Sequence, residues 1–249
     1  MQPAMVLPPI YEAAEHFAEG LAPVRRGRFF GYIDGSGALV IPPQFDEARL
    51  FSSGIAPVRQ GERWGFINRR GDLTISLRFQ DAHSLQDDVA CVRANGLWGY
   101  IDPQGEFTIP AQFEEANSFR DGLAPVRSGK LWGFIDKIGT FVIPPKFELA
   151  HSFSEGLADV KIGGKWGYID HEGRFALPAI WDETGAMQDG LASVRKGGKW
   201  GYIRPNGSFA VQLQFDSAGP FDAGLAEVRA GGRTEYIDRT GKVVWKSLP

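Results

Sequence analysis

Residues 156–170 read Gly-Leu-Ala-Asp-Val-Lys-Ile-Gly-Gly-Lys-Trp-Gly-Tyr-Ile-Asp, and this stretch decides the fold because its pattern returns along the whole chain. The Trp-Gly pair recurs every 34 residues, at Trp64, Trp98, Trp132, Trp166 and Trp200. One step earlier the same phase holds Phe30-Gly31, and one step later it holds Thr234-Glu235. Seven copies without an insertion or deletion indicate a tandem repeat protein.

Each repeat alternates short apolar segments with turn residues. In the fourth copy, residues 123–127 and 132–136 alternate in polarity as half-buried strands do, and Ser128-Gly129-Lys130 lies between them as a turn. A third strand over 141–143 is expected to stop at Pro144-Pro145, because proline cannot donate to a ladder. Each repeat is therefore predicted to be a three-stranded antiparallel meander with a return segment. No stretch shows helical periodicity, so the predicted class is all-β.

One meander buries too little apolar surface to be stable alone, so neighbouring repeats are expected to share a core. We predict a single domain over residues 10–249, preceded by an N-terminal extension, residues 1–9. The repeats fall approximately at 10–43, 44–77, 78–111, 112–145, 146–179, 180–213 and 214–249. The tryptophan of each repeat is expected between repeats, with its glycine admitting a neighbouring backbone.

The motif Gly-Leu-Ala-x-Val, followed by Lys-Trp-Gly-Tyr-Ile-Asp at Lys165–Asp170, resembles the bacterial WG (KWG) repeat family. The resemblance covers residues 10–249 and implies an all-β repeat domain without shared catalytic residues. Repeat 7 departs most from the motif, because Thr234-Glu235-Tyr236 replaces Trp-Gly-Tyr.

Two arrangements of the seven repeats follow from the sequence. The chain begins with a return segment and ends with a third strand, which would allow closure into a seven-bladed β-propeller. Thirty-four residues are few for a four-stranded blade, and the altered seventh repeat could act as a cap. We favour a tightly wound open superhelix and keep the closed propeller as the alternative.

The composition excludes several classes of function. A net charge of −3 provides no general attraction to nucleic acid, and the single cysteine, Cys91, excludes a disulfide framework or a cysteine-rich metal site. No apolar run is long enough to span a bilayer, and the prolines near the N-terminus argue against a secretory signal. We expect a soluble, cytoplasmic protein without cofactors, and we leave the oligomeric state open.

The sequence contains no unique cluster of catalytic residues. His83 and His151 share one repeat position, where other copies hold Glu, Arg, Asn or Gly, and are interpreted as residues of a solvated loop. Paired acids such as Asp182-Glu183 recur once per repeat and are interpreted as a solvated rim. Cys91 is interpreted as an inert small strand residue. The chain is therefore predicted not to be an enzyme.

A cation follows the recurring valine in every repeat and suggests a binding surface. The simplest interpretation pairs it with the Asp that ends the next strand, as in Asp136 and Asp170. Repeat 6 has Arg204 in place of that Asp and lacks an acid in the hairpin. The candidate anion-binding residues are Arg195, Lys196, Lys199 and Arg204, together with Arg127, Lys161 and Arg229. Stacking in register would place cations along one stripe and the acids of the return segments along another.

The predicted function is a non-enzymatic scaffold that binds another protein through charged stripes and variable loops, as an adaptor, an inhibitor or an immunity-type protein. The alternative is a carbohydrate-binding module that uses a row of aromatic residues. A buried tryptophan row favours the scaffold, and Trp181 and Trp245, outside that row, are interpreted as packing variants. We expect no nucleic-acid partner and no insertion into a membrane.

Overall fold

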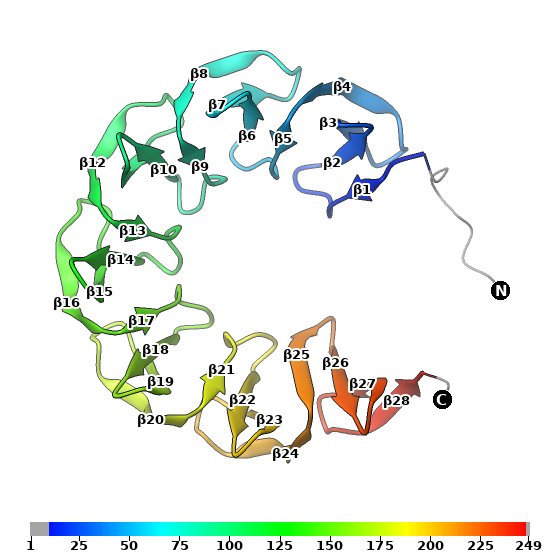
Figure 1. The fold of residues 1–249 in the computed structure, drawn as a ribbon, viewed down its shortest axis with the longest axis vertical. Helices are drawn as coiled ribbons and strands as arrows, with labels where there is room; N and C mark the ends of the chain where they lie inside the picture. The colour runs from blue at the N-terminus through cyan, green and yellow to red at the C-terminus, as the bar shows by residue number, and fades with distance from the viewer. Residues whose placement is uncertain (1–9, 248–249) are drawn as a thin grey trace. The chain divides into compact units, whose positions relative to one another are not determined.

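The computed structural model describes residues 10–247, and all regular structure in that range is β-strand (Figure 1). Its 28 strands form seven four-stranded antiparallel sheets, one for each repeat. The predicted all-β class and the seven tandem repeats are confirmed. The predicted extension, residues 1–9, lies outside the described residues. Within residues 10–247, no helix has the length and apolar character needed to cross a membrane.

The chain divides into two compact units, Met1–Phe119 and Arg120–Pro249. The first unit contains the three complete sheets formed by β1 to β12. The second unit contains the sheets β17–β20, β21–β24 and β25–β28. It also contains β14, β15 and β16 of the sheet before them, whose first strand β13 belongs to the first unit. The choice between superhelix and propeller, and the single domain, stay predictions.

The centre of every sheet is a β-hairpin. Its first strands are β2 (Leu21–Arg26), β6 (Ile55–Gln60), β10 (Ala90–Ala94), β14 (Ala124–Ser128), β18 (Ala158–Ile162), β22 (Ala192–Lys196) and β26 (Leu225–Ala230). Its second strands are β3 (Phe29–Asp34), β7 (Arg63–Asn68), β11 (Leu97–Ile101), β15 (Leu131–Ile135), β19 (Lys165–Ile169), β23 (Lys199–Ile203) and β27 (Arg233–Asp238). The β18–β19 turn consists of Gly163 and Gly164 with φ of 58° and 73°, and a two-residue turn of this kind matches the twist of the hairpin.

The last strand of each sheet is an edge strand that extends beyond the predicted end. These strands are β4 (Leu39–Phe45), β8 (Leu73–Phe79), β12 (Phe107–Phe113), β16 (Phe141–Phe147), β20 (Phe175–Trp181), β24 (Phe209–Phe215) and β28 (Val243–Lys246). The predicted stop at Pro144-Pro145 is wrong, because β16 continues to Phe147. An edge strand tolerates proline, and the pairing of β15 with β16 shifts register at this point, between Trp132 and Phe134.

The glycine after each tryptophan admits the bulged edge strand of its own sheet. A Cβ atom on Gly133 would lie 2.6 Å from the carbonyl oxygen of Ile143 and 2.7 Å from the nitrogen of Pro145. Both atoms belong to β16, which pairs with β15. The predicted close approach of a neighbouring backbone is confirmed, and that backbone is the edge strand of the same sheet.

The return segment contributes a fourth strand that the sequence did not reveal. The strands concerned are β1 (Ala13–Ala14), β5 (Glu47–Ala48), β9 (Asp81–Ala82), β13 (Glu115–Ala116), β17 (Leu149–Ala150), β21 (Glu183–Thr184) and β25 (Ser217–Asp222). Six of them have only two residues within the described chain, which is too short to show alternating polarity. The three-stranded meander is thus corrected to a four-stranded sheet.

The core lies between successive sheets. In the second unit, Trp132 and Phe134 of β15 belong to one buried cluster with Val160 of β18 and Ile169 of β19. In the first unit, Trp64 packs in the same way in a cluster with Val92 of the following sheet. These contacts confirm that the tryptophans pack between repeats.

Loop residues join successive repeats by hydrogen bonds from a backbone N–H to an acidic side chain 35 residues earlier. In the second unit these bonds run from Gly156 to Asp121, from Gly190 to Glu155 and from Gly224 to Asp189, at 2.9–3.1 Å. The three acids adopt left-handed backbone conformations, with φ between 51° and 54°. We refer to this series of bonds as the loop ladder.

Substitution Glu155→Ala is expected to lower the free energy of unfolding by about 1 kcal/mol, because the N–H of Gly190 loses its acceptor. Glu155→Gln retains a side-chain oxygen and should remain close to the native value. Urea denaturation followed by tryptophan fluorescence measures both. Equal losses in the two variants would contradict a role for this hydrogen bond.

Candidate functional site

The predicted cations of repeat 6 separate into two places. Arg195 and Lys196 end β22, Lys199 begins β23, and Lys196 lies opposite Lys199 in the register. Arg204 follows the other end of β23, five residues beyond Lys199. At the rise of a strand, this places the two backbones roughly 17 Å apart. The structure therefore brings three of the four residues together and excludes Arg204 from the group.

Acids from outside the hairpin partner two of these cations. Arg195 Nη2 lies 2.8 Å from Glu183 Oε1 of β21, and Lys199 Nζ lies 2.6 Å from Asp216 Oδ1, which directly follows β24. The hydrogen bond from Lys199 is the main reason that the pKa of Asp216 is below its usual value. Arg204 instead donates to the backbone oxygen of Phe209 at 2.7 Å.

The aspartates that end the hairpins act within their own turns. Asp136 Oδ1 accepts the backbone N–H groups of Ile138 and Thr140 at 3.1 Å and 2.8 Å. The same arrangement occurs at Asp34, Asp102, Asp170 and Asp238. The predicted pairing of the repeat cation with this aspartate is wrong, because the carboxylate caps a turn. Cation and acid alternate locally at the hairpins, so the expectation of separate stripes is also wrong there.

The other three candidates occupy the repeat position of Arg195. Arg127, Lys161 and Arg229 lie on β14, β18 and β26, where the register places them opposite Trp132, Trp166 and Thr234. Arg127 Nη1 donates to the backbone oxygen of Gly129 at 2.8 Å. Each belongs to a different sheet, so these residues form one position per repeat rather than one cluster.

The second unit also contains a cavity with polar side chains that the sequence did not predict. Its volume is about 310 Å³, and it is lined by Arg120, His151, Ser152, Phe153, Ser154, Ala186 and Gln188. We call it the His151 cavity. Residues 10–247 contain no group of three or more His, Cys, Asp and Glu side chains placed to hold a metal ion.

His151 is bonded to a buried carboxylate. Its Nδ1 lies 2.7 Å from Oδ2 of Asp159, whose residue surface is 2% exposed, and Thr184 donates to the same oxygen at 2.9 Å. The other oxygen, Oδ1, is buried without a hydrogen-bond partner in the described chain. The hydrogen bond to Asp159 raises the pKa of His151 against the opposing effect of burial. The ring also stacks on Trp166, with centroids 4.9 Å apart.

His83 occupies the same repeat position without a hydrogen-bonded carboxylate among the described residues, and the charges of Arg49 and Asp81 act on it in opposite directions. Its ring lies 5.2 Å from that of Trp98, and buried Cys91 takes the position that Asp159 has in repeat 5. Burial is the main cause that lowers the pKa of His83, and it raises the pKa of the Cys91 thiol, which suits an inert strand residue. The interpretation as a solvated loop residue is confirmed for His151, which lies in a loop with its side chain 54% exposed. It is wrong for His83, whose half-buried ring packs on Trp98.

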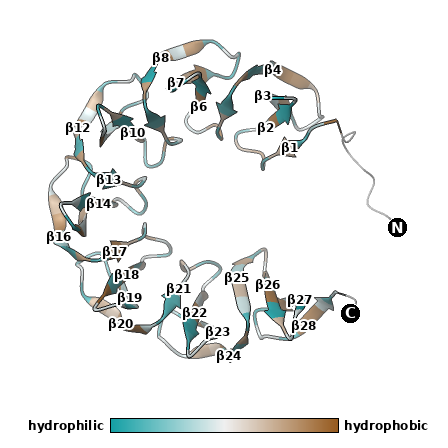
Figure 2. Cartoon of the chain, viewed as in Figure 1, coloured by the Kyte–Doolittle hydropathy of each residue, from teal (hydrophilic) through white to brown (hydrophobic). Residues whose placement is uncertain are grey.

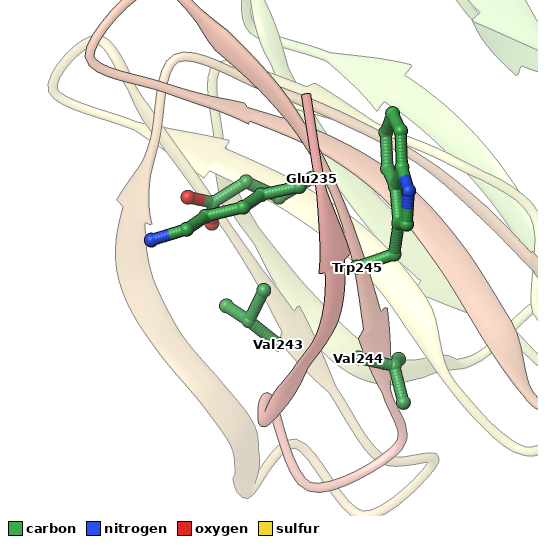
Figure 3. A pocket seen from close by; sticks show the side chains of 5 residues that line it. Glu235, Val243, Val244 and Trp245 are labelled. Atoms are coloured by element: carbon green, nitrogen blue, oxygen red, sulfur yellow. The ribbon is translucent and has the colours of Figure 1, made fainter. Parts of the chain in front are cut away.

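The edge strand β28 exposes a patch of apolar residues (Figure 3). Val243, Val244 and Trp245 are 42%, 57% and 54% exposed, and they line a cavity of about 410 Å³ with Glu235 and Lys246. The interpretation of Trp245 as a packing variant is wrong, since within the second unit no later sheet covers β28. Trp181 is buried in the cluster that includes Val194, which confirms the interpretation for that residue.

The seven four-stranded sheets and the recurring Trp-Gly pair are consistent with the family that the sequence matches. Residues 2–27, 30–64, 64–98, 98–132, 132–166, 166–200 and 200–233 match the family described as "WG containing repeat". The chain belongs to the WG-repeat family. No individually curated protein matches the sequence of this WG-repeat protein significantly.

Solved structures resemble this WG-repeat protein in fold alone. A eukaryotic initiation factor aligns with a TM-score of 0.64 and 8% identity over 97% of this chain and 79% of its own. Hsv2 from Kluyvelomyces marxianus aligns with a TM-score of 0.56 and 8% identity over 95% of this chain and 97% of its own. Identities this low carry no information about function.

Proposed function

We propose that this WG-repeat protein is a non-enzymatic scaffold that binds another protein, as an adaptor, an inhibitor or an immunity-type protein. The observation that supports this best is that, in each of the two units, exposed apolar residues recur at the first position of the edge strands. Five members, between 41% and 50% exposed, are Leu39, Leu73, Phe107, Phe175 and Val243. Figure 2 shows hydrophobic colour on these edge strands, for example β4, β20 and β28. Leu39, Leu73 and Phe107 belong to the first unit and Phe175 and Val243 to the second, and we call these five equivalent positions the apolar row.

Exposed apolar groups that recur along a surface are typical of protein-binding sites, because a partner removes them from water. Part of each aromatic member packs on the preceding sheet, as Phe175 of β20 does against Phe147 of β16 with ring centroids 6.4 Å apart. The rings are therefore held in place before a partner arrives, which lowers the entropic cost of binding.

Proline residues favour recognition through side chains at these edges. β4, β12, β16 and β20 contain proline, which removes backbone donors that an added strand would need. The hairpin cations add charge near the sheets, so association should be faster at low salt. Cytoplasmic location and independence from cofactors remain predictions.

The test is affinity capture from host lysate at low and moderate salt, with Phe175→Ser as the variant and Ile138→Ser as its control. Ile138 is 81% exposed but lies in a turn outside the apolar row. We expect one stoichiometric protein, with binding weakened about tenfold by Phe175→Ser and unchanged by Ile138→Ser. Equal binding by both variants, or no captured protein, would contradict the proposal.

The candidate anion-binding residues are tested in the same assay. Arg195→Glu is expected to weaken capture more than Arg25→Glu, since Arg195 lies beside Lys196 and Lys199 at one hairpin end. Equal effects of the two reversals would remove the cations of repeat 6 from the proposed binding surface.

One observation favours the alternative function, a carbohydrate-binding module. Trp245 is exposed beside Tyr236, with ring centroids 5.7 Å apart, and such a pair can stack on a sugar. The tryptophans of the repeat motif do not provide a row of such sites, because Trp64, Trp132 and Trp166 are buried. A glycan array, with Trp245→Ala as the variant, tests this function: binding lost in the variant would favour it over the scaffold.

A further inference from the structure

His83 and His151 share a repeat position but differ in the residue beneath the ring. The carboxylate of Asp159 lies 2.7 Å from Nδ1 of His151, which occupies that ring nitrogen. The side chain of His151 is otherwise 54% exposed. Cys91 provides no charge beneath His83. Repeat 5 therefore has an acid, Asp159, that favours a positively charged imidazole at His151, whereas repeat 3 has the uncharged Cys91 at the equivalent position.

A second cationic residue, Arg120, lines the same cavity as His151. Gln188, Ser152 and Ser154 add polar groups to its wall. None of the described residues that line it is acidic. Guanidinium and imidazolium groups in one cavity of about 310 Å³ suit a planar carboxylate, which accepts hydrogen bonds from both.

We propose that the His151 cavity binds a carboxylate side chain of an acidic peptide segment in the protein partner, with Arg120 and His151 as its cationic contacts. This inference rests on the proposed scaffold function and names the chemistry of one contact point. The buried Asp159 is a positioning residue, since it fixes the ring of His151 and stays within the sheet.

The charged groups around the cavity are compatible with an anion. Asp121 and Glu155 flank Arg120 and Ser154 in the chain, but their carboxylates accept the N–H groups of Gly156 and Gly190 in the loop ladder. His171 stacks on Phe153, with centroids 4.2 Å apart, and its Nε2 lies 3.2 Å from the backbone oxygen of Asp121. Asp121 and Glu155 therefore have carboxylates already engaged by backbone donors, and Asp159 is bonded to the Nδ1 side of His151.

Binding should depend on pH with a definite sign. The pKa of His151 is raised, so the imidazolium persists to a higher pH than an ordinary histidine and is lost as pH rises through that raised value. The peptide should therefore bind at pH 6 and more weakly at pH 9, while its own carboxylates stay ionised throughout this range.

The test is isothermal titration calorimetry of the full chain with an acetylated, amidated hexaglutamate peptide at pH 6. We expect Arg120→Gln and His151→Gln each to weaken binding about tenfold, the effect of losing one charged hydrogen bond. His83→Gln is the matched control and should bind like the native chain. Arg120 is exposed, so its variant tests the cavity even if His151→Gln alters stability.

The remaining outcomes decide against the inference. Absence of hexaglutamate binding, equal weakening by His83→Gln, or inorganic phosphate binding as tightly as the peptide would each overturn it. If the native chain and Arg120→Gln capture the same lysate protein equally while the peptide does not bind, this inference fails and the scaffold function stands. If no protein is captured but the peptide binds at this cavity, the scaffold function fails instead.

Discussion

Gly65→Ala is expected to lower the free energy of unfolding by about 3 kcal/mol, the upper end of the usual cost of overpacking. The new methyl group would lie 2.5 Å from the carbonyl oxygen of Ile75 and 2.9 Å from the nitrogen of Leu77. Both are backbone atoms of β8, so relief requires the edge strand to move and its bulge to open. Urea denaturation followed by tryptophan fluorescence measures the loss, and Trp64 beside the site reports on it directly.

Gly35→Ala is the matched control within the same unit. A methyl group on Gly35 would meet no described atom within 4 Å, and the backbone there has no left-handed angle. A small gain of roughly 0.5 kcal/mol is expected there, because alanine reduces the freedom of the unfolded chain. Comparable losses in the two variants would show that the Trp-Gly step does not depend on close backbone approach.

The second large effect is expected from His151→Gly at pH 7, with a loss of about 2 kcal/mol in the free energy of unfolding. Asp159 is 2% exposed and would lose one of its two hydrogen-bond donors, which leaves a buried carboxylate poorly compensated. Thermal unfolding followed by circular dichroism provides the measurement. The loss is placed below the roughly 3–5 kcal/mol of fully buried pairs because the side chain of His151 is 54% exposed.

Repeat 6 suggests a second substitution that should restore stability, because it has Gly185 at the position of His151 and Ser193 at the position of Asp159. Adding Asp159→Ser to His151→Gly should restore most of the stability by removing the buried charge. If the double variant is no more stable than His151→Gly alone, the loss comes from packing on Trp166 rather than from the carboxylate.

The same pair should make stability depend on pH. A pKa that is raised in the folded state contributes stability below the unfolded value of about 6.5, and the contribution is lost as pH rises through the folded value. The difference in stability between the native chain and His151→Gln should therefore be larger at pH 6 than at pH 9. A constant difference would contradict a charged His151 in the folded protein.

The constant repeat length made the number of repeats and the positions of their hairpin strands predictable from the sequence. A period of 34 residues identified the repeats, and polarity alternation located the hairpin strands such as β14 and β15. The first strand, such as β17 with two residues, is too short to produce alternation. Pro144-Pro145 resembled a strand end because a sequence does not reveal which strand is an edge, and only an edge strand accommodates them.

The candidate site was harder to predict because its partners lie at long separations. Lys199 pairs with an acid 17 residues later, in contrast to the nearby aspartate that was expected. The pairing of Asp159 with His151 was not predicted, because the two residues are eight positions apart and Asp159 lies in an ordinary strand, where other repeats have proline, cysteine or serine. The signal was an acid at a position that is otherwise never charged in repeats 1 to 6.

The loop ladder constrains how genes for such proteins can change in length. Each rung joins positions 35 apart, so an insertion of one or two codons within a repeat displaces donor from acceptor at the adjoining rungs. Gain or loss of a whole 34-residue segment brings an equivalent glycine to an equivalent acid at the junction. Recombination between the homologous stretches of one gene can therefore add or delete whole repeats while the loop-ladder hydrogen bond at each junction is kept.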